Sequence, residues 1–293
     1  MRKNKVWFFI SIISFIAIGI SMVSCLQNEN GIKKPVISVS ILPQKYFVEK
    51  ISGENFIVNV LIPSGASPAS YEPSPLQIKQ LEGSAMYLKN GELGFEKTWI
   101  SNLEKKLTNI GFYNTSEGID LLEGGSHSHG SHQHAVDPHV WISPKNVKVI
   151  AKNIYLAITS FDPENAEFYK SNLKTFENEL DSLDNIIKEK LKSCTHRHFI
   201  IYHPALSYFA RDYGLVQVPL EMEGKEPGFQ HMQQIVDMAK EDNIRLILIQ
   251  REFNMDEAKT LESEINGKIV VINPLDYEWS QQLLYITDQF VHL

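Results

Sequence analysis

The sequence has few cysteines and no excess of positive charge, and both shortages limit what the protein can be. Lys and Arg number 28 against 35 Asp and Glu, so the net charge of −7 offers nucleic acid no electrostatic footprint. Cys25 and Cys194 must either pair with each other or leave the chain without a disulfide. Hydrophobic residues make up 43% of the chain, enough for one large core or two smaller ones. The charged fraction of 22% and the full set of aromatic residues argue against disorder. The sequence predicts a folded protein without a nucleic-acid partner.

The first 24 residues have the pattern of an export signal. Three positive charges precede an apolar run from Val6 to about Val23. A membrane-spanning helix is the alternative, because the run approaches the ~20 residues that a span needs. The following Met22-Val23-Ser24-Cys25 resembles a bacterial lipobox, which favours the signal peptide and lipid modification of Cys25. We expect an exported protein that is anchored to the cell membrane by lipid, in the periplasm or on the extracytoplasmic face.

Two consequences follow from a lipid-modified Cys25. Residues 25–34 lack apolar periodicity and are expected to form a tether between the lipid and the globular body. Cys194 is then alone, and we interpret it as a buried or inert thiol, since no other cysteine lies near it.

Strand and helix signals alternate through the rest of the chain. The strands are expected within 36–42, 56–65, 85–91, 198–202, 215–218, 245–250 and 268–272. The helices are expected within 43–51, 74–82, 143–161, 204–214, 229–242 and 255–265. The strands at 245–250 and 268–272 are nearly all apolar, as strands buried on both faces are. This alternation predicts an α/β fold with parallel sheets.

Residues 161–193 predict one long helix between two α/β lobes. The segment has no internal proline or glycine beyond Pro163. An apolar stripe lies along one face, formed by Tyr169, Leu173, Phe176, Leu180, Leu183, Ile187 and Leu191. The alternative is a solvated coiled-coil arm. We predict an N-terminal lobe at 35–160, the linking helix at 161–193 and a C-terminal lobe at 194–293.

Half of the ten histidines lie between residues 127 and 139. No apolar residue occurs between Gly124 and Gln133, so nothing can fold this part into a rigid shell, and we expect a mobile loop at 124–136. Its imidazoles suit zinc, copper and nickel, and a plain polar linker is the alternative. The loop histidines are His127, His129, His132 and His134.

Three other residues are better candidates for a rigid metal site. His139 lies in "DPHVWISP", where prolines restrain the backbone. His203 and Asp276 follow predicted strands, at the edge where open α/β sheets bind ligands. Each of these residues alone is better explained by a structural role, but the three together predict a metal site in a shared cleft.

The sequence resembles the ZnuA-like solute-binding lipoproteins that serve ABC importers of zinc and manganese. The motifs that carry the resemblance are the lipobox, "GASPASYEPSP", the histidine-rich loop, "DPHVWISP", "HPALSYFARDYGL" and "NPLDYEW". The resemblance implies two α/β lobes joined by a rigid helix, metal in the cleft and docking onto a membrane permease. It also implies that His139 and His203 are the second and third histidine ligands. The last ligand is a carboxylate, matched by Asp276, although some members use the place of Asn273.

The chain departs from the family at the first ligand, because Ala69 stands where a histidine is usual. Water, a loop histidine or one of four side chains could replace it, namely Tyr71, Glu72, Glu223 and Glu226. Asp137 is a candidate partner for the other ring nitrogen of His139, or only a turn residue. Glu252, after a predicted strand, is a further candidate for the cleft, whereas Trp141 and Tyr208 are expected to pack beside it.

These observations predict a monomeric metal-binding protein that captures zinc and delivers it to an ABC importer permease. Zinc is favoured because the loop is rich in imidazole and has neither cysteine nor methionine. A manganese or iron protein of the same type is an alternative, since added carboxylates favour those ions. A zinc-dependent hydrolase is another, but the chain has no H-E-x-x-H motif, and we expect no enzyme. A surface adhesin would require a large exposed apolar patch.

Overall fold

The computed structural model describes residues 34–124, 136–221, 227–253 and 255–291. The predicted signal peptide, the lipidation site Cys25 and nearly all of the tether lie outside these residues. In the part of the chain that is described, no helix is both long and apolar enough to cross a membrane. Residues Pro35–Leu293 form one compact unit. Its two four-stranded parallel sheets agree with the predicted fold class.

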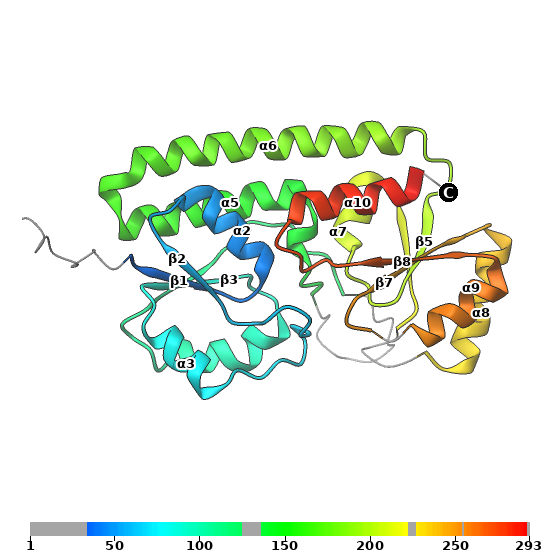
Figure 1. Ribbon diagram of the computed structural model, residues 1–293, viewed down its shortest axis with the longest axis horizontal. Helices are drawn as coiled ribbons and strands as arrows, with labels where there is room; N and C mark the ends of the chain where they lie inside the picture. The colour runs from blue at the N-terminus through cyan, green and yellow to red at the C-terminus, as the bar shows by residue number, and fades with distance from the viewer. Residues whose placement is uncertain (1–33, 125–135, 222–226, 254, 292–293) are drawn as a thin grey trace, which may run out of the picture. The chain divides into compact units, whose positions relative to one another are not determined.

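The N-terminal lobe is built on the first sheet, whose strand order is β2-β1-β3-β4. Its strands are β1 (Val36–Val39), β2 (Ile57–Val60), β3 (Met86–Lys89) and β4 (Gly111–Asn114). The helices α2 (Leu42–Ser52) and α5 (Pro144–Phe161) lie on one side of the sheet, and α3 (Pro75–Glu82) on the other (Figure 1). A π-helical turn (Glu96–Ile100) leads into the short α4 (Ser101–Glu104). Ser74 and Ser143 cap α3 and α5 as the sequence predicts, because each hydroxyl accepts a backbone N–H of the first turn.

The C-terminal lobe is built on the second sheet, whose order is β6-β5-β7-β8. Its strands are β5 (His198–Ile201), β6 (Val216–Pro219), β7 (Leu246–Gln250) and β8 (Lys268–Ile272). Its helices are α7 (Ser207–Tyr213), α8 (Phe229–Glu241), α9 (Asp256–Ile265) and α10 (Trp279–Val291). One side of the sheet faces α7 and α10, and the other faces α8 and α9 (Figure 1). Gly214 ends α7 with a φ of 66°, a conformation that glycine adopts without a Cβ clash.

The long helix α6 (Ala166–Lys192) follows a single 3-10 turn at Pro163–Asn165. It packs against α2 and α5 and also against α10. The predicted stripe is buried except for Leu173, which is partly buried, so α6 is not a solvated arm. One continuous core cluster contains this stripe and residues of both sheets, such as Val39 and Leu248. The two lobes therefore share a core along α6.

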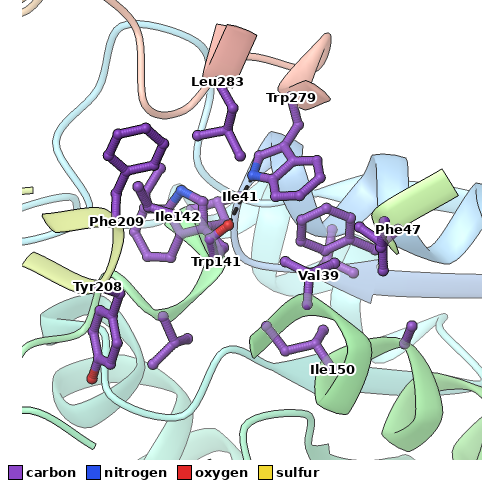
Figure 2. Packing of buried hydrophobic residues seen from close by; sticks show 14 of the residues in the cluster. Val39, Ile41, Phe47, Trp141, Ile142, Ile150, Tyr208, Phe209, Trp279 and Leu283 are labelled. Carbon is purple, nitrogen blue, oxygen red and sulfur yellow. Dashed lines mark hydrogen bonds between the residues drawn. The ribbon is translucent and has the colours of Figure 1, made fainter. Parts of the chain in front are cut away.

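Two buried tryptophans connect the segment around residue 140 to the C-terminal part of the chain. The Trp279 Nε1–H donates to the Trp141 carbonyl at 2.8 Å, as the dashed line in Figure 2 marks. The Trp141 Nε1–H donates to the Pro274 carbonyl at 2.8 Å. Both indoles are 1% exposed, so each hydrogen bond forms away from water. Because His139 lies two residues before Trp141, these bonds also fix the backbone near His139.

Sheet order explains where the expected strands differ from those observed. Strand β7 is buried at every residue, as predicted. Strand β8 is the edge strand, with Lys268 exposed and Val271 42% exposed, so the prediction that it is buried on both faces was wrong. No predicted element corresponds to β4 or to α10. Strand β4 has only four residues, Gly-Phe-Tyr-Asn, too few to show a period.

We predict that Trp279→Phe lowers the free energy of unfolding by more than the smaller side chain alone would account for. The Trp141 carbonyl would lose its indole donor in a buried site, which costs about 1–3 kcal/mol. Urea denaturation followed by circular dichroism measures the change. Tyr285→Phe on the exposed side of α10 is the control, and its free energy of unfolding should stay within about 0.5 kcal/mol of the unmodified protein. Equal effects of the two variants would contradict the prediction.

Candidate metal centre

A cavity of about 460 Å³ lies at the carboxyl ends of the strands. In the N-terminal lobe its walls come from segments that follow β2, β3 and β4. In the C-terminal lobe they come from segments that follow all four strands. The lining residues are Ser67–Ala69, Leu93, Gly94, Gly124, Val136–His139, Trp141, His203–Ala205, Glu221, Gln250, Glu252, Phe253, Pro274 and Leu275. The carboxyl edge of parallel sheets, where α/β proteins bind ligands, therefore forms the walls on both sides.

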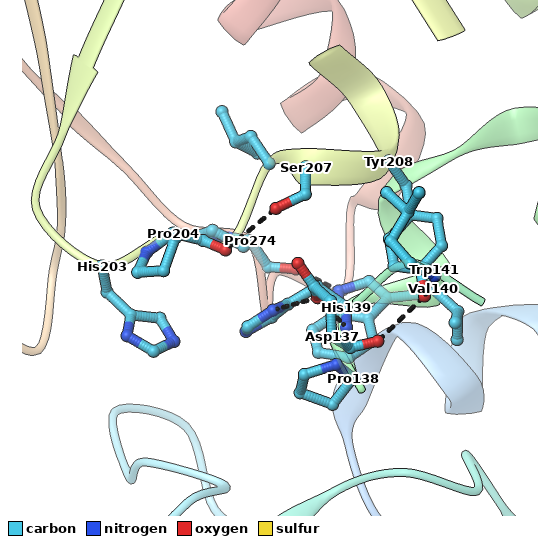
Figure 3. A network of polar contacts seen from close by, with 12 residues as sticks. Asp137, Pro138, His139, Val140, Trp141, His203, Pro204, Ser207, Tyr208 and Pro274 are labelled. Atoms are coloured by element: carbon cyan, nitrogen blue, oxygen red, sulfur yellow. Dashed lines mark hydrogen bonds and ion pairs between the residues drawn. The ribbon is translucent and has the colours of Figure 1, made fainter. Parts of the chain in front are cut away.

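His139 is held at the cavity by Asp137. The Asp137 Oδ1 atom lies 2.8 Å from His139 Nδ1 and accepts the His139 backbone N–H at 2.8 Å (Figure 3). Burial opposes ionisation of this 5% exposed carboxyl, but the hydrogen bonds and charge of His139, with a bond from Ser207, lower the pKa of Asp137 overall. The Tyr208 hydroxyl donates to the Asp137 carbonyl at 2.9 Å. Asp137 is thus the partner of His139 that the sequence analysis considered.

His203 is held in the same way from the C-terminal lobe. Its Nδ1 atom lies 2.9 Å from Glu221 Oε2, in the segment that follows β6. The Gln250 side chain fixes the His203 backbone, accepting its N–H at 3.2 Å and donating to its carbonyl. The Phe253 ring stacks on the imidazole at 5.7 Å with an angle of 23° between the ring planes. The His203 ring therefore has a fixed orientation.

The two imidazoles lie side by side in the cavity. Their ring centroids are 5.2 Å apart, and the ring planes are inclined at 71°. Both Nδ1 atoms are engaged by carboxylates, so the Nε2 atoms are the nitrogens left for a ligand. Carboxylate–histidine pairs of this kind orient metal-binding imidazoles and raise their basicity. Among the described residues, no three His, Cys, Asp or Glu side chains come close enough to hold a metal ion together.

The buried Glu96 fixes the wall of the cavity on the N-terminal side. Its carboxyl oxygens accept the backbone N–H of Asn90 at 2.7 Å and that of Gly91 at 2.6 Å, and also the Ser40 hydroxyl. The Asn90 amide in turn donates to the Pro138 carbonyl at 3.0 Å, one residue before His139. Burial raises the pKa of Glu96 to about 7, although these hydrogen bonds oppose the shift.

Ala69 lines the cavity and presents only a methyl group. Its backbone packs against Gly94, where an added Cβ would lie 3.0 Å from the Ala69 carbonyl oxygen. The two candidate replacements beside it do not line the cavity: Glu72 is exposed, and the Tyr71 hydroxyl donates to Gln77 Oε1 at 2.9 Å. The structure thus brings neither side chain to the two imidazoles.

Asp276 is also absent from the lining of the cavity. Its Oδ2 atom accepts from the Asn273 side chain at 2.9 Å, and its Oδ1 atom accepts the Glu278 backbone N–H at 2.9 Å. In this arrangement Asp276 orders the turn before α10. Its role as a ligand stays a prediction.

Several predicted site residues lie outside the described residues, namely Glu223, Glu226, His127, His129, His132 and His134. The two ends of the histidine-rich segment are described. Gly124 and Val136 both line the cavity, and Glu123 pairs with Val136 in an antiparallel bridge. The segment therefore starts and ends at the cavity.

Glu221 and Gln250, the two side chains that fix His203, were not among the predicted site residues. Glu221 lies in "LEMEGKEPG", where two other glutamates were considered instead. Gln250 is the last residue of β7. The signal for both is their place at or just beyond the carboxyl end of a strand, the criterion that selected His203: Gln250 ends the buried β7, and Glu221 lies two residues beyond the edge strand β6.

Comparisons with known proteins agree on one family. Residues 37–288 match the family described as "Zinc-uptake complex component A periplasmic". The chain is 34% identical over 271 residues to the "High-affinity zinc uptake system protein ZnuA" of Bacillus subtilis, covering 89% of this chain and 84% of that protein. It is 28% identical to the "Zinc-binding lipoprotein AdcA" of Streptococcus pneumoniae, and it spans only 53% of that protein's length. A crystal structure of ZnuA superimposes with a TM-score of 0.84 at 35% identity, covering 89% of this chain and 99% of the other.

We predict that Glu96 makes the metal-free protein less stable as the pH rises from about 4.5 to about 7. The folded state holds a proton on Glu96 up to about pH 7, whereas an unfolded glutamate loses it near its ordinary value of 4.5. The stabilisation that this proton provides is fully present below the pKa of Glu96 in the unfolded state. It is lost as the pH rises through the pKa of Glu96 in the folded state. The loss is on the order of 1 kcal/mol per pH unit.

Urea denaturation in the presence of EDTA at several pH values tests this prediction. Glu96→Gln should remove this part of the pH dependence, while the exposed Glu82→Gln should keep it. A Glu96→Gln profile parallel to that of the unmodified protein would show that Glu96 does not titrate in this range.

Proposed function

Since the chain belongs to the zinc-uptake complex component A family, we propose that it captures a zinc ion in the cavity and passes it to the permease of an ABC importer. The observation that supports this most directly is the pair of carboxylate-held imidazoles. One comes from the segment that follows the first sheet and the other from the second sheet, and their ring centroids are 5.2 Å apart. His139 and His203 bind the ion through their Nε2 atoms.

The chemistry of the two donors favours zinc. Neutral imidazole is a good zinc ligand, whereas manganese prefers oxygen donors. Asp137 and Glu221 hold the Nδ1 protons, so the Nε2 lone pairs point away from them. Asp137 and Glu221 bond to the Nδ1 atoms, on the side of each ring away from Nε2. Each carboxylate–histidine pair therefore offers a nitrogen, and not an oxygen, to the ion. Asp276 would add an oxygen donor if its turn were rearranged, and the site would then suit manganese as well.

Delivery to a permease requires a bound ion that can leave. The His203 side chain is 28% exposed and the His139 side chain 14%, so the site is open to solvent on one side. The long helix α6 packs against helices α2, α5 and α10 of both lobes, which opposes large hinge motion. The ion therefore enters and leaves through the open side of the cavity. The chain binds and releases its cargo without catalysing a reaction.

We also propose that the protein is exported and held at the membrane by a lipid on Cys25. The relative in Streptococcus pneumoniae is named a lipoprotein, and the lipobox of this chain is the sequence feature that supports an anchor here. The histidine-rich segment collects zinc and passes it to His139 and His203, because both of its ends line the cavity.

We predict one tight zinc site in the protein lacking residues 125–135, as measured by calorimetric titration. The site should be lost on His203→Ala, because one of the two imidazole donors is removed. The control is His196→Ala, which removes an exposed imidazole that does not line the cavity. No tight site after the deletion would mean that the loop itself binds the metal, and the cavity proposal would fail.

We predict that Asp137→Asn weakens zinc binding by about 10–100-fold, the usual loss when the carboxylate partner of a ligating histidine is removed. An amide in this place offers its own N–H to Nδ1 and favours the wrong tautomer. Competition with a chromophoric chelator measures the affinity. Asp181→Asn, on the exposed face of α6, should bind zinc as tightly as the unmodified protein. Unchanged affinity in Asp137→Asn would mean that His139 does not bind the ion.

A further inference from the structure

Glu252 is a carboxylate in the cavity wall for which the described part of the chain supplies no partner. It lies two residues beyond the end of β7 and lines the cavity together with His139 and His203. Within the described residues its side chain makes no hydrogen bond and no ion pair. Glu252 is half-buried, and a negative charge that is partly withdrawn from water in a cavity wall points to a cationic ligand.

The turn that contains Glu252 is attached to His203 on both sides. Before Glu252, the Gln250 side chain bonds to the backbone N–H and carbonyl of His203. After it, the Phe253 ring stacks on the His203 imidazole. The Phe253 N–H closes the turn by donating to the Gln250 carbonyl at 3.1 Å. The backbone of this turn is therefore fixed relative to His203, while the Glu252 side chain can rotate.

The strand register places the turn that contains Glu252 beside His203. Strands β5 and β7 are neighbours, and Ile201 pairs with Leu248. Two residues further along in each segment, His203 therefore lies beside Gln250. Neighbouring strands are about 4.8 Å apart. Glu252 follows Gln250 by two residues and lines the same cavity as His203.

The other carboxylates near the cavity are already engaged. Asp137 and Glu221 each bond to an Nδ1 atom on the side of the ring away from Nε2. Both oxygens of Asp276 accept hydrogen bonds within its own turn. On the opposite wall, Ala69 offers no donor atom.

We propose that Glu252 is the third protein ligand of the metal ion and stands in for the donor that Ala69 lacks. Resting on the proposed function, this inference assigns the site two imidazoles and one carboxylate, with the fourth position open to exchange. Two histidines and a glutamate form an established zinc-binding set. Because three such side chains do not meet in the described structure, Glu252 must turn toward the Nε2 atoms when the ion enters.

The test is Glu252→Gln in the full chain, which keeps the side-chain size and removes the charge. Calorimetry should find that zinc binds at the tight site at least about tenfold more weakly. Removing a direct ligand should cost no less affinity than removing the carboxylate partner of a ligating histidine. Cobalt(II) bound in place of zinc provides a second measurement, because its visible absorption depends on the ligand set. The spectrum of Glu252→Gln should differ from that of the unmodified protein.

Two controls separate this inference from the proposed function. Glu241→Gln, at the exposed end of α8, removes the same charge away from the cavity and should change neither the affinity nor the spectrum. His203→Ala should abolish tight binding. If His203→Ala abolishes it while Glu252→Gln keeps both the affinity and the cobalt spectrum, Glu252 is not a ligand and only this inference falls. If His203→Ala binds zinc normally, the proposed function itself falls.

Discussion

The structure depends on the hydrogen bonds that join the segment 137–142 to the C-terminal part of the chain. The indole N–H of Trp141 reaches the Pro274 carbonyl, and the indole N–H of Trp279 reaches the Trp141 carbonyl. Both bonds are buried, where an unpaired carbonyl or N–H is costly. The segment that bears His139 is therefore fixed to the chain that follows the last strand of the other lobe. These bonds, together with the shared core along α6, set the separation of the two halves of the candidate site.

A second constraint acts on the imidazoles themselves. An isolated histidine after a strand can rotate and exchange its proton between two nitrogens. Here a carboxylate holds the Nδ1 atom of each ring, and the lowered pKa of Asp137 keeps that carboxylate ionised despite its burial. Tautomer and orientation are thus set before any ligand arrives, which reduces the ordering cost of binding. Residues 125–135 include neither Asp nor Glu, so no carboxylate within this segment can orient its imidazoles in the same way.

The cavity walls that hold His139 and His203 are fixed by hydrogen bonds, whereas the opposite wall at Ala69 offers the ion no side-chain donor. Glu96 and Asn90 fix the wall near Pro138, while Gln250 and Phe253 fix His203. Ala69 leaves one wall without a donor. Such a combination suits a protein that must hold a metal ion and then give it up, because the fixed donors select the ion and the open position permits exchange.

Much of this protein could be read from its sequence. The alternation of strand and helix signals determined the α/β class, the apolar stripe determined the long helix α6, and the prolines around His139 and the strand before His203 identified the two imidazoles. These properties depend on neighbours in the chain, and local patterns record them.

The tertiary structure alone decided how the segments meet. It placed β8 at a sheet edge, paired Glu221 with His203, engaged Asp276 within its own turn and put Glu252 in the cavity wall. Each of these outcomes depends on strand order and on contacts between residues far apart in the chain. A single sequence does not specify which of several nearby carboxylates meets a given imidazole, because that choice is made by the packing of the two sheets.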